Sequence, residues 1–184
     1  MERRAFVLPI AAALAFAAFW WPQRDAPRSA SAPAASWCLG PGPEYTLARP
    51  GDALAPGSPF RLRVQCDEAC HVYVFRCTDE AAPERLHPAA EAPAPAPQPL
   101  PAGAHWLPGR AGERDLRWST PSTAATFVVV AARAPVADFQ ALLARAAGGA
   151  AAAPMVNGPL APDALLPGVW TGAWRVRTLA DSGR

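Results

Sequence analysis

The run from Phe60 to Cys77, FRLRVQCDEACHVYVFRC, constrains the fold more than any other part of the chain. Its first half alternates apolar residues with Arg61 and further polar residues, the pattern of a strand with one buried face and one charged outer face. In its second half, His71 to Cys77, apolar side chains occupy both faces, which predicts a strand near the centre of a sheet. The run therefore predicts two strands joined by a tight turn, with Cys66 and Cys70 facing each other across the hairpin.

An apolar segment near the N-terminus predicts that the chain leaves the cytoplasm. Arg3 and Arg4 precede an apolar run from Ala5 to Trp21. At about 1.5 Å per residue this run spans roughly 25 Å, close to the ~30 Å hydrocarbon core of a bilayer. We predict that residues 1–21 form an uncleaved membrane anchor. Cleavage at the A-x-A site Ala15–Ala17, which would release the protein into the periplasm, is the alternative.

Composition narrows the fold and function classes. All 17 basic residues are arginine and the formal net charge is only +2, so we expect no nucleic-acid partner. The 23 prolines and 13 glycines interrupt the chain too often for long helices. We predict a mainly β fold, an antiparallel β-sandwich or open barrel with one packed helix. Residues 22–36 are predicted to be a Pro/Ala-rich linker, 37–179 a single extracytoplasmic β-domain and 180–184 a tail.

Periodicity places the remaining elements. Short strands are predicted at residues 85–88 and 116–118, and a strand buried on both faces at 126–132. Apolar residues at helical spacing predict an amphipathic helix over 138–147, packed on the sheet. Alternation over 174–178 predicts a closing strand. The core is expected to bury Tyr73, Phe75, Val128 and Val130.

Short motifs across residues 54–145 carry a family resemblance. They are LAPG at 54–57, FRLRV at 60–64, HVYVF at 71–75, RLHP at 85–88, LPAG at 100–103 and TFVVVAARAPVADFQALL at 126–143. Their order resembles a bacterial family catalogued as domain of unknown function 4384. Such domains are often appended to signalling proteins, including serine/threonine kinases and caspase-like proteins, so the resemblance implies a binding, sensing or adaptor module. The cysteines and the Pro/Ala-rich insertion depart from the family pattern.

The cysteines allow three chemistries that exclude one another. Outside the cytoplasm a structural disulfide between Cys66 and Cys70 is the first expectation, with Cys38–Cys77 as the complementary bond. Because His71 directly follows Cys70, covalent haem attachment is an alternative, although the spacing has one residue more than C-x-x-C-H. Zinc held by Cys66, Cys70, Cys77 and a histidine is the third.

Other candidate groups are sparse. His87 and His105 are isolated from any nucleophile motif, so ordinary packing or surface roles are expected for both. Acidic residues cluster around predicted turns, which leaves a paired-carboxylate hydrolase as a weak third function class. No catalytic residue, cofactor site or metal site is assigned. Most tryptophans are expected in the core, whereas Trp106 and Trp170 are candidates for an exposed binding surface.

These observations lead to one function and one competitor. We expect a non-enzymatic recognition or sensory accessory domain, held by residues 5–21 as a single-pass protein of the bacterial inner membrane, with its C-terminal domain in the periplasm. Its partner would be a protein or an envelope ligand. The link to envelope signalling follows from the resemblance. The competitor is an exported redox or haem-binding protein that uses Cys66, Cys70 and His71.

Overall fold

The structure is a computed structural model. It describes residues 31–40, 44–79, 81–89, 98–136, 141–142, 144, 157–163, 166 and 168–179. The chain divides into two compact units, residues 1–30 and 31–184, and the described residues all belong to the second unit. The predicted membrane segment, residues 1–21, lies outside them. Within the described part of the chain, no helix is long and apolar enough to cross a membrane.

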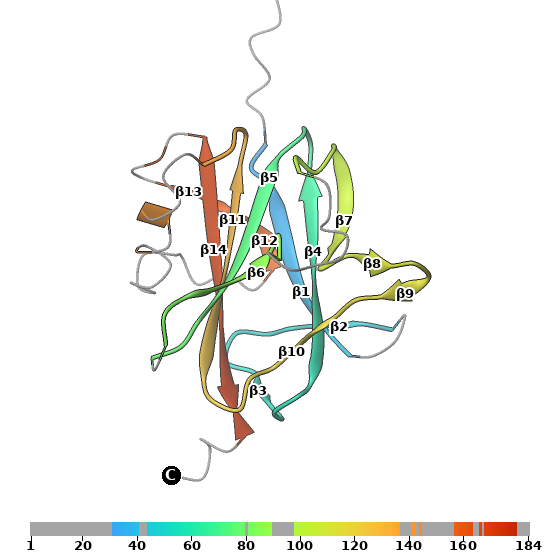
Figure 1. Cartoon of the computed structure of the whole chain (residues 1–184), viewed down its shortest axis with the longest axis vertical. Coiled ribbons are helices and arrows are strands. Elements are labelled where there is room, and N and C mark those ends of the chain that lie inside the picture. Colours follow the sequence, from blue (N-terminus) through green and yellow to red (C-terminus); the bar gives the residue numbers. More distant parts are fainter. Residues whose placement is uncertain are drawn as a thin grey trace, which may run out of the picture. The chain divides into compact units, whose positions relative to one another are not determined.

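The second unit is mainly β, and its two larger sheets pack face to face (Figure 1). The first sheet contains β10 (Trp118–Ser119), β4 (Pro59–Cys66), β1 (Ala34–Leu39) and β12 (Asn157–Pro159) in that order, with β2 (Thr46–Leu47) beside β1 and β7 (Gly103–Leu107) beside β4. The second contains β13 (Ala161–Pro162), β14 (Val169–Thr178), β11 (Ala125–Ala132), β5 (His71–Cys77) and β6 (Glu84–His87), with β3 (Ala53–Leu54) beside β14. Strands β8 (Arg110–Ala111) and β9 (Arg114–Asp115) form a small hairpin. This sandwich-like arrangement confirms the predicted β architecture.

The predicted hairpin between β4 and β5 is wrong, because the two strands belong to different sheets. Strand β4 pairs with β1 on one edge and with β7 and β10 on the other, and β5 lies between β11 and β6. The turn at residues 67–69 therefore carries the chain from the first sheet to the second. Alternation of apolar and polar residues is the same whether a strand pairs with its neighbour in sequence or crosses to the opposite sheet.

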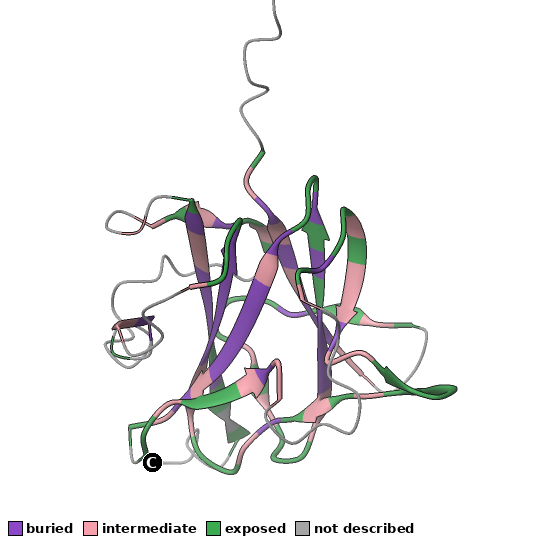
Figure 2. Cartoon of the chain, turned by 45° about the horizontal axis from the view of Figure 1, so that its top comes forward, coloured by how far each residue is buried: buried purple, intermediate pink, exposed green. Residues whose placement is uncertain are grey.

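Between the sheets lies an aromatic core. Trp37 of β1 and Phe60 of β4 meet Phe127 of β11 and Trp174 of β14, and all four side chains are fully buried. The Phe60 and Phe127 ring centroids are 4.7 Å apart, and those of Trp37 and Trp174 are 5.3 Å apart. Buried residues run along the long strands (purple in Figure 2), whereas exposed residues lie mainly in loops and short strands. This cluster is what holds the two sheets together.

The outer face of the second sheet is covered by the chain itself. The four predicted core residues there, Tyr73, Phe75, Val128 and Val130, are buried, which confirms that prediction. Leu142 packs on them, together with the partly buried Val136 and Leu166. Of the predicted helix at 138–147, residues 141, 142 and 144 are helical, and the others lie outside the described residues. The second sheet therefore has apolar layers on both sides.

The beginnings of three strands differ from the predictions. Strand β1 begins at Ala34, inside the segment predicted as a linker, because residues 34–36 pair with both β4 and β12. The strand predicted at 116–118 starts only at Trp118, since the Leu116 N–H donates to the Gly109 carbonyl at the base of the β8–β9 hairpin. The strands predicted at 85–88 and 126–132 are confirmed as β6 and β11. The closing strand predicted at 174–178 is confirmed as the end of β14, which begins five residues earlier, at Val169, because residues 169–173 pair with β11.

Candidate functional site

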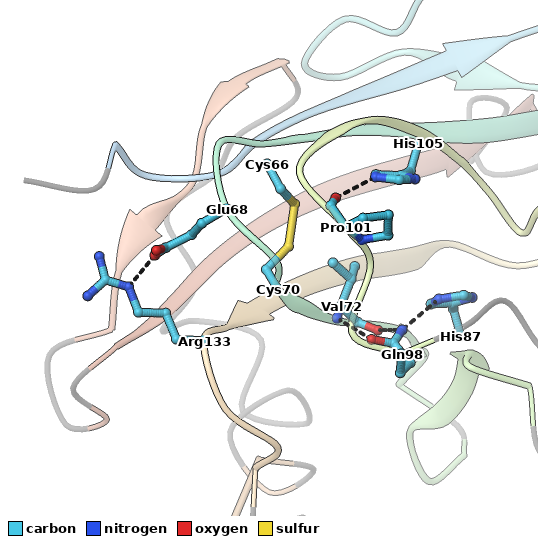
Figure 3. The surroundings of a disulfide bond; sticks show 9 residues. All are labelled: Cys66, Glu68, Cys70, Val72, His87, Gln98, Pro101, His105 and Arg133. Atoms are coloured by element: carbon cyan, nitrogen blue, oxygen red, sulfur yellow. Dashed lines mark hydrogen bonds and ion pairs between the residues drawn. A yellow bond between two sulfur atoms is a disulfide. The ribbon is translucent and has the colours of Figure 1, made fainter. Parts of the chain in front are cut away.

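The Cys66–Cys70 disulfide joins the two sheets of the sandwich (Figure 3). Cys66 ends β4 and Cys70 immediately precedes β5, with their Cα atoms 6.7 Å apart, a separation that disulfides span. Both residues are 1% exposed and belong to the core between the sheets. The predicted bond is therefore confirmed, but it closes a turn between two sheets rather than the end of a hairpin.

The fold separates His71 from these sulfurs. His71 pairs with Ala132, which belongs to the cluster on the outer face of the second sheet, whereas Cys66 and Cys70 belong to the core on the inner face. Cys77 lies at the other end of β5, in the outer cluster. No group of three or more His, Cys, Asp or Glu side chains that could hold a metal ion occurs among the described residues. The histidine and the cysteines of the predicted cluster thus do not converge.

The predicted Cys38–Cys77 bond is not formed, and both residues are buried thiols. Cys38 pairs with Arg61 on the outer face of the first sheet, while Cys77 belongs to the outer cluster of the second sheet, so the core lies between them. Burial raises the pKa of both thiols. At Cys38 the charges of Arg63 and Arg61 oppose that shift in pKa. The two thiols are therefore kept mainly protonated at neutral pH.

Replacing both bridging cysteines, in Cys66→Ala/Cys70→Ala, should lower the free energy of unfolding by about 2 kcal/mol, because the short loop limits the entropy that the bond removes from the unfolded chain. Denaturant unfolding measures this loss, with Cys38→Ala as the control that removes a buried sulfur without removing a bond. Alkylation of the unreduced, denatured protein followed by peptide mapping should label Cys38 and Cys77 and find Cys66 linked to Cys70. A haem absorption band or stoichiometric zinc in the purified protein would contradict the disulfide assignment.

Trp106 lies on the outer face of the first sheet against a buried arginine. It pairs with Arg63 across the strands, and the Tyr45 ring stacks on it with the ring centroids 5.0 Å apart. The Arg61 Cζ is 5.0 Å from the Trp106 ring centroid and 5.7 Å from that of Tyr45, and Arg61 Nη1 donates a 2.9 Å hydrogen bond to the Tyr45 hydroxyl. Arg61 is only 3% exposed. The prediction that Arg61 faces solvent is therefore wrong, because the aromatic side chains cover it.

Asp115 balances the buried guanidinium charge. Its carboxylate oxygens lie 3.1 Å from Arg61 Nη1 and 3.3 Å from Arg110 Nε. Since an isolated buried charge is costly, the pairing explains why the β8–β9 hairpin, which supplies Asp115, reaches this face. We refer to Tyr45, Arg61, Trp106 and Asp115 as the arginine–aromatic cluster.

Trp170 belongs to a different surface. It lies in β14 of the second sheet and packs against the core, with the Arg133 Cζ 5.4 Å from its ring centroid. Arg133 Nε also pairs with Glu68 Oε1 at 2.6 Å, which ties this side chain to the disulfide turn (Figure 3). The fold therefore does not bring the two candidate tryptophans, Trp106 and Trp170, together.

A buried polar cluster surrounds His87 (Figure 3). The ring is 2% exposed, and its Nε2 is 3.1 Å from the amide nitrogen of Gln98. The same amide pairs with the backbone of Val72: Gln98 Oε1 accepts from the Val72 N–H at 3.1 Å, and Gln98 Nε2 donates to the Val72 carbonyl at 3.0 Å. Burial lowers the pKa of His87 from 6.5 to about 4. The imidazole is therefore neutral at pH 7.

Neither the arginine–aromatic cluster nor the polar cluster at His87 could be predicted from the sequence. Gln98 lies near the end of the Pro/Ala-rich insertion, residues 89–99, and no spacing rule connects it to His87. Arg61 looked like any other polar position of an alternating strand. Trp106 was a candidate for an exposed surface, but nothing in the sequence paired it with Arg61.

Comparisons with family models, with curated proteins and with solved structures find no match to the chain.

Proposed function

We propose that this chain is a non-enzymatic recognition or sensory accessory domain, anchored by residues 5–21 in the bacterial inner membrane and acting in the periplasm in envelope signalling. Its recognition surface is the outer face of the first sheet, centred on the arginine–aromatic cluster. The single observation that carries this assignment is the buried Arg61 guanidinium held against Trp106 and Tyr45.

Three features of that face support recognition of a partner. Tryptophan, tyrosine and arginine are the residue types that contribute most to protein interfaces. The stack and the Asp115 ion pair hold these side chains in place before binding, which reduces the entropy lost on association. Leu47, on the neighbouring strand β2, is 53% exposed and adds apolar surface, whereas the outer face of the second sheet is covered by Leu142 and its neighbours.

The location rests on other observations. The apolar run from Ala5 to Trp21 is typical of an export or anchor segment, and the Cys66–Cys70 disulfide suits an oxidising compartment. The signalling role follows from the resemblance to the family of domain of unknown function 4384. Release of the chain into the periplasm by cleavage near Ala15–Ala17 would leave the same recognition face.

Pull-down from detergent-solubilised envelope extracts, with the full chain as bait, tests the proposal. Trp106→Ala should weaken retention of the captured partner by about thirtyfold, the effect of losing an interface residue worth about 2 kcal/mol. Trp170→Ala is the matched control, because it removes the same side chain from a different surface. Equal loss in both variants, or no partner that Trp106→Ala releases, would contradict the assignment of this face.

A further inference from the structure

A four-residue segment, residues 98–101, lies along β5 beyond the end of β6. Strand β6 pairs with β5 at Val74 to Arg76, and the segment continues on that edge, where the backbones of Cys70 and Leu100 exchange hydrogen bonds of 2.9 and 2.8 Å. The Gln98 side chain pairs with the Val72 backbone in the same way that a neighbouring strand would. We call residues 98–101 the strap.

Two histidines hold the strap, and they do so with opposite hydrogen-bond roles. The Gln98 amide oxygen accepts from the Val72 N–H, so the amide nitrogen is the group that faces His87, and an amide nitrogen only donates. His87 Nε2 must therefore accept, which places the proton of the neutral ring on Nδ1. His105 Nε2 lies 2.7 Å from the Pro101 carbonyl oxygen, which only accepts, so this nitrogen must donate.

Protonation therefore affects the two contacts differently. A protonated His87 carries an N–H on Nε2 that meets the N–H of Gln98, and two donors cannot share a hydrogen bond. Rotating the Gln98 amide would restore that contact only by breaking both of its bonds to Val72. A protonated His105 still donates to Pro101. Acid therefore breaks the contact of His87 with Gln98 and leaves the contact of His105 with Pro101 in place.

Besides His87, the acidic, arginine and histidine residues of β6 and of the adjacent β5 are Glu84, Arg85, Arg76 and His71. Arg76 and Glu84 form an ion pair with each other. Arg85 pairs with Phe75, and His71 pairs with Ala132. Because Phe75 and Ala132 belong to the cluster on the outer face of the second sheet, Arg85 and His71 lie on that outer face. His87 instead pairs with Val74 of the inner core. Across the core, His105 pairs with Val64 of the first sheet, and the described strap residues carry no charge.

We propose that the strap is an acid-released latch, in which protonation of His87 breaks the Gln98 clamp on Val72 and frees residues 98–101 from the edge of β5. Release uncovers the buried Leu100 side chain and the backbone N–H and carbonyl groups of Cys70 and Val72. A strand edge with such groups exposed pairs readily with another extended chain. The acidic state thereby gains a strand-pairing edge beside the disulfide.

Nuclear magnetic resonance of the ¹⁵N-labelled full chain tests the starting state directly. Long-range proton–nitrogen correlations of the imidazole at pH 7 should show His87 protonated on Nδ1 and unprotonated on Nε2. A proton on Nε2 of His87 at pH 7 would overturn the proposal, because that ring could not accept from Gln98. This measurement needs no variant and so does not depend on a substituted protein folding.

Amide hydrogen exchange tests the release. Protection of the Cys70, Val72 and Leu100 amides should fall on the order of a hundredfold between pH 7 and pH 4, after correction for intrinsic exchange. It should stay below that of Val129 of β11 at both pH values, because Val129 exchanges only when the whole domain unfolds. His87→Gln supplies an amide oxygen that accepts from Gln98 at every pH and should abolish this local fall. His105→Gln is the matched control and should leave it in place.

Two outcomes of the exchange experiment would overturn the latch. If Val72 is as well protected as Val129 at both pH values, the strap opens only when the whole domain unfolds. If His87→Gln shows the same local fall as the unsubstituted chain, another group controls the strap.

Discussion

Phe75→Ala should lower the free energy of unfolding by about 3–5 kcal/mol, a large part of the stability of a domain of this size. Phe75 is fully buried in β5 and packs in the outer cluster with Val128, Val130 and Leu142. Truncation removes most of its apolar surface and leaves a cavity that neighbouring β-strands cannot close, because their backbones are fixed by the sheet. Equilibrium denaturant unfolding of the full chain measures the loss.

Leu47→Ala is the control for this prediction. Leu47 also lies in a strand, but it is 53% exposed, so its truncation should change stability by no more than about 0.5 kcal/mol. An unchanged denaturant midpoint for Phe75→Ala would show that the outer face of the second sheet is open to solvent, contrary to the cover that Leu142 provides.

The second large effect is a loss of stability in mild acid through His87. Its pKa is about 4 in the folded chain and about 6.5 when unfolded, so the unfolded state binds the proton more readily. The stabilising contribution is complete above about pH 6.5 and is lost as the pH falls through that value towards 4. By pH 4 the loss should reach about 3 kcal/mol, since each unit of pKa difference corresponds to about 1.4 kcal/mol.

Carboxylates also titrate in acid, so the contribution of His87 is read as a difference between two proteins. The glutamine of His87→Gln does not titrate between pH 4 and 7. Between pH 7 and pH 4, the free energy of unfolding should therefore fall by about 3 kcal/mol less in the variant than in the unsubstituted chain. Chemical denaturation at several pH values gives both curves. Parallel curves would mean that His87 is charged in the folded protein at pH 4 to 7 without penalty, and that its burial is not the source of acid sensitivity.

Local pattern was enough to predict which segments are strands. The apolar faces of β5 and β11 contain Tyr73, Phe75, Val128 and Val130, and all four are buried as expected. Period-two alternation reports the backbone conformation and the number of buried faces, because neighbouring side chains of a strand point to opposite sides. The close spacing of Cys66 and Cys70 made the disulfide the first of three expected chemistries, since a short turn keeps the sulfurs near each other in either topology.

Strand partners were not contained in that pattern. The predicted hairpin failed because the alternation within β4 and β5 does not depend on whether each strand pairs with the other or with β1 and β11. The predicted Cys38–Cys77 bond failed for the same reason, because it required knowing which sheet each cysteine joins. The start of β1 at Ala34 was missed because small residues carry little periodic signal, and pairing with β12 decides their conformation.

The sequence by itself determined the β character, the nearness of Cys66 to Cys70 and the apolar N-terminal segment, all of which depend on residues close in the chain or on composition. Only the tertiary structure decided the burial and the partners of Arg61 and His87, the two side chains on which the proposals depend. Arg61 is buried because Trp106, Tyr45 and Asp115 arrive from distant parts of the chain to cover and pair it. His87 becomes a neutral acceptor only because the fold removes it from water and places Gln98 against it. Burial and partner identity are properties of the assembled sheets, and no local spacing encodes them.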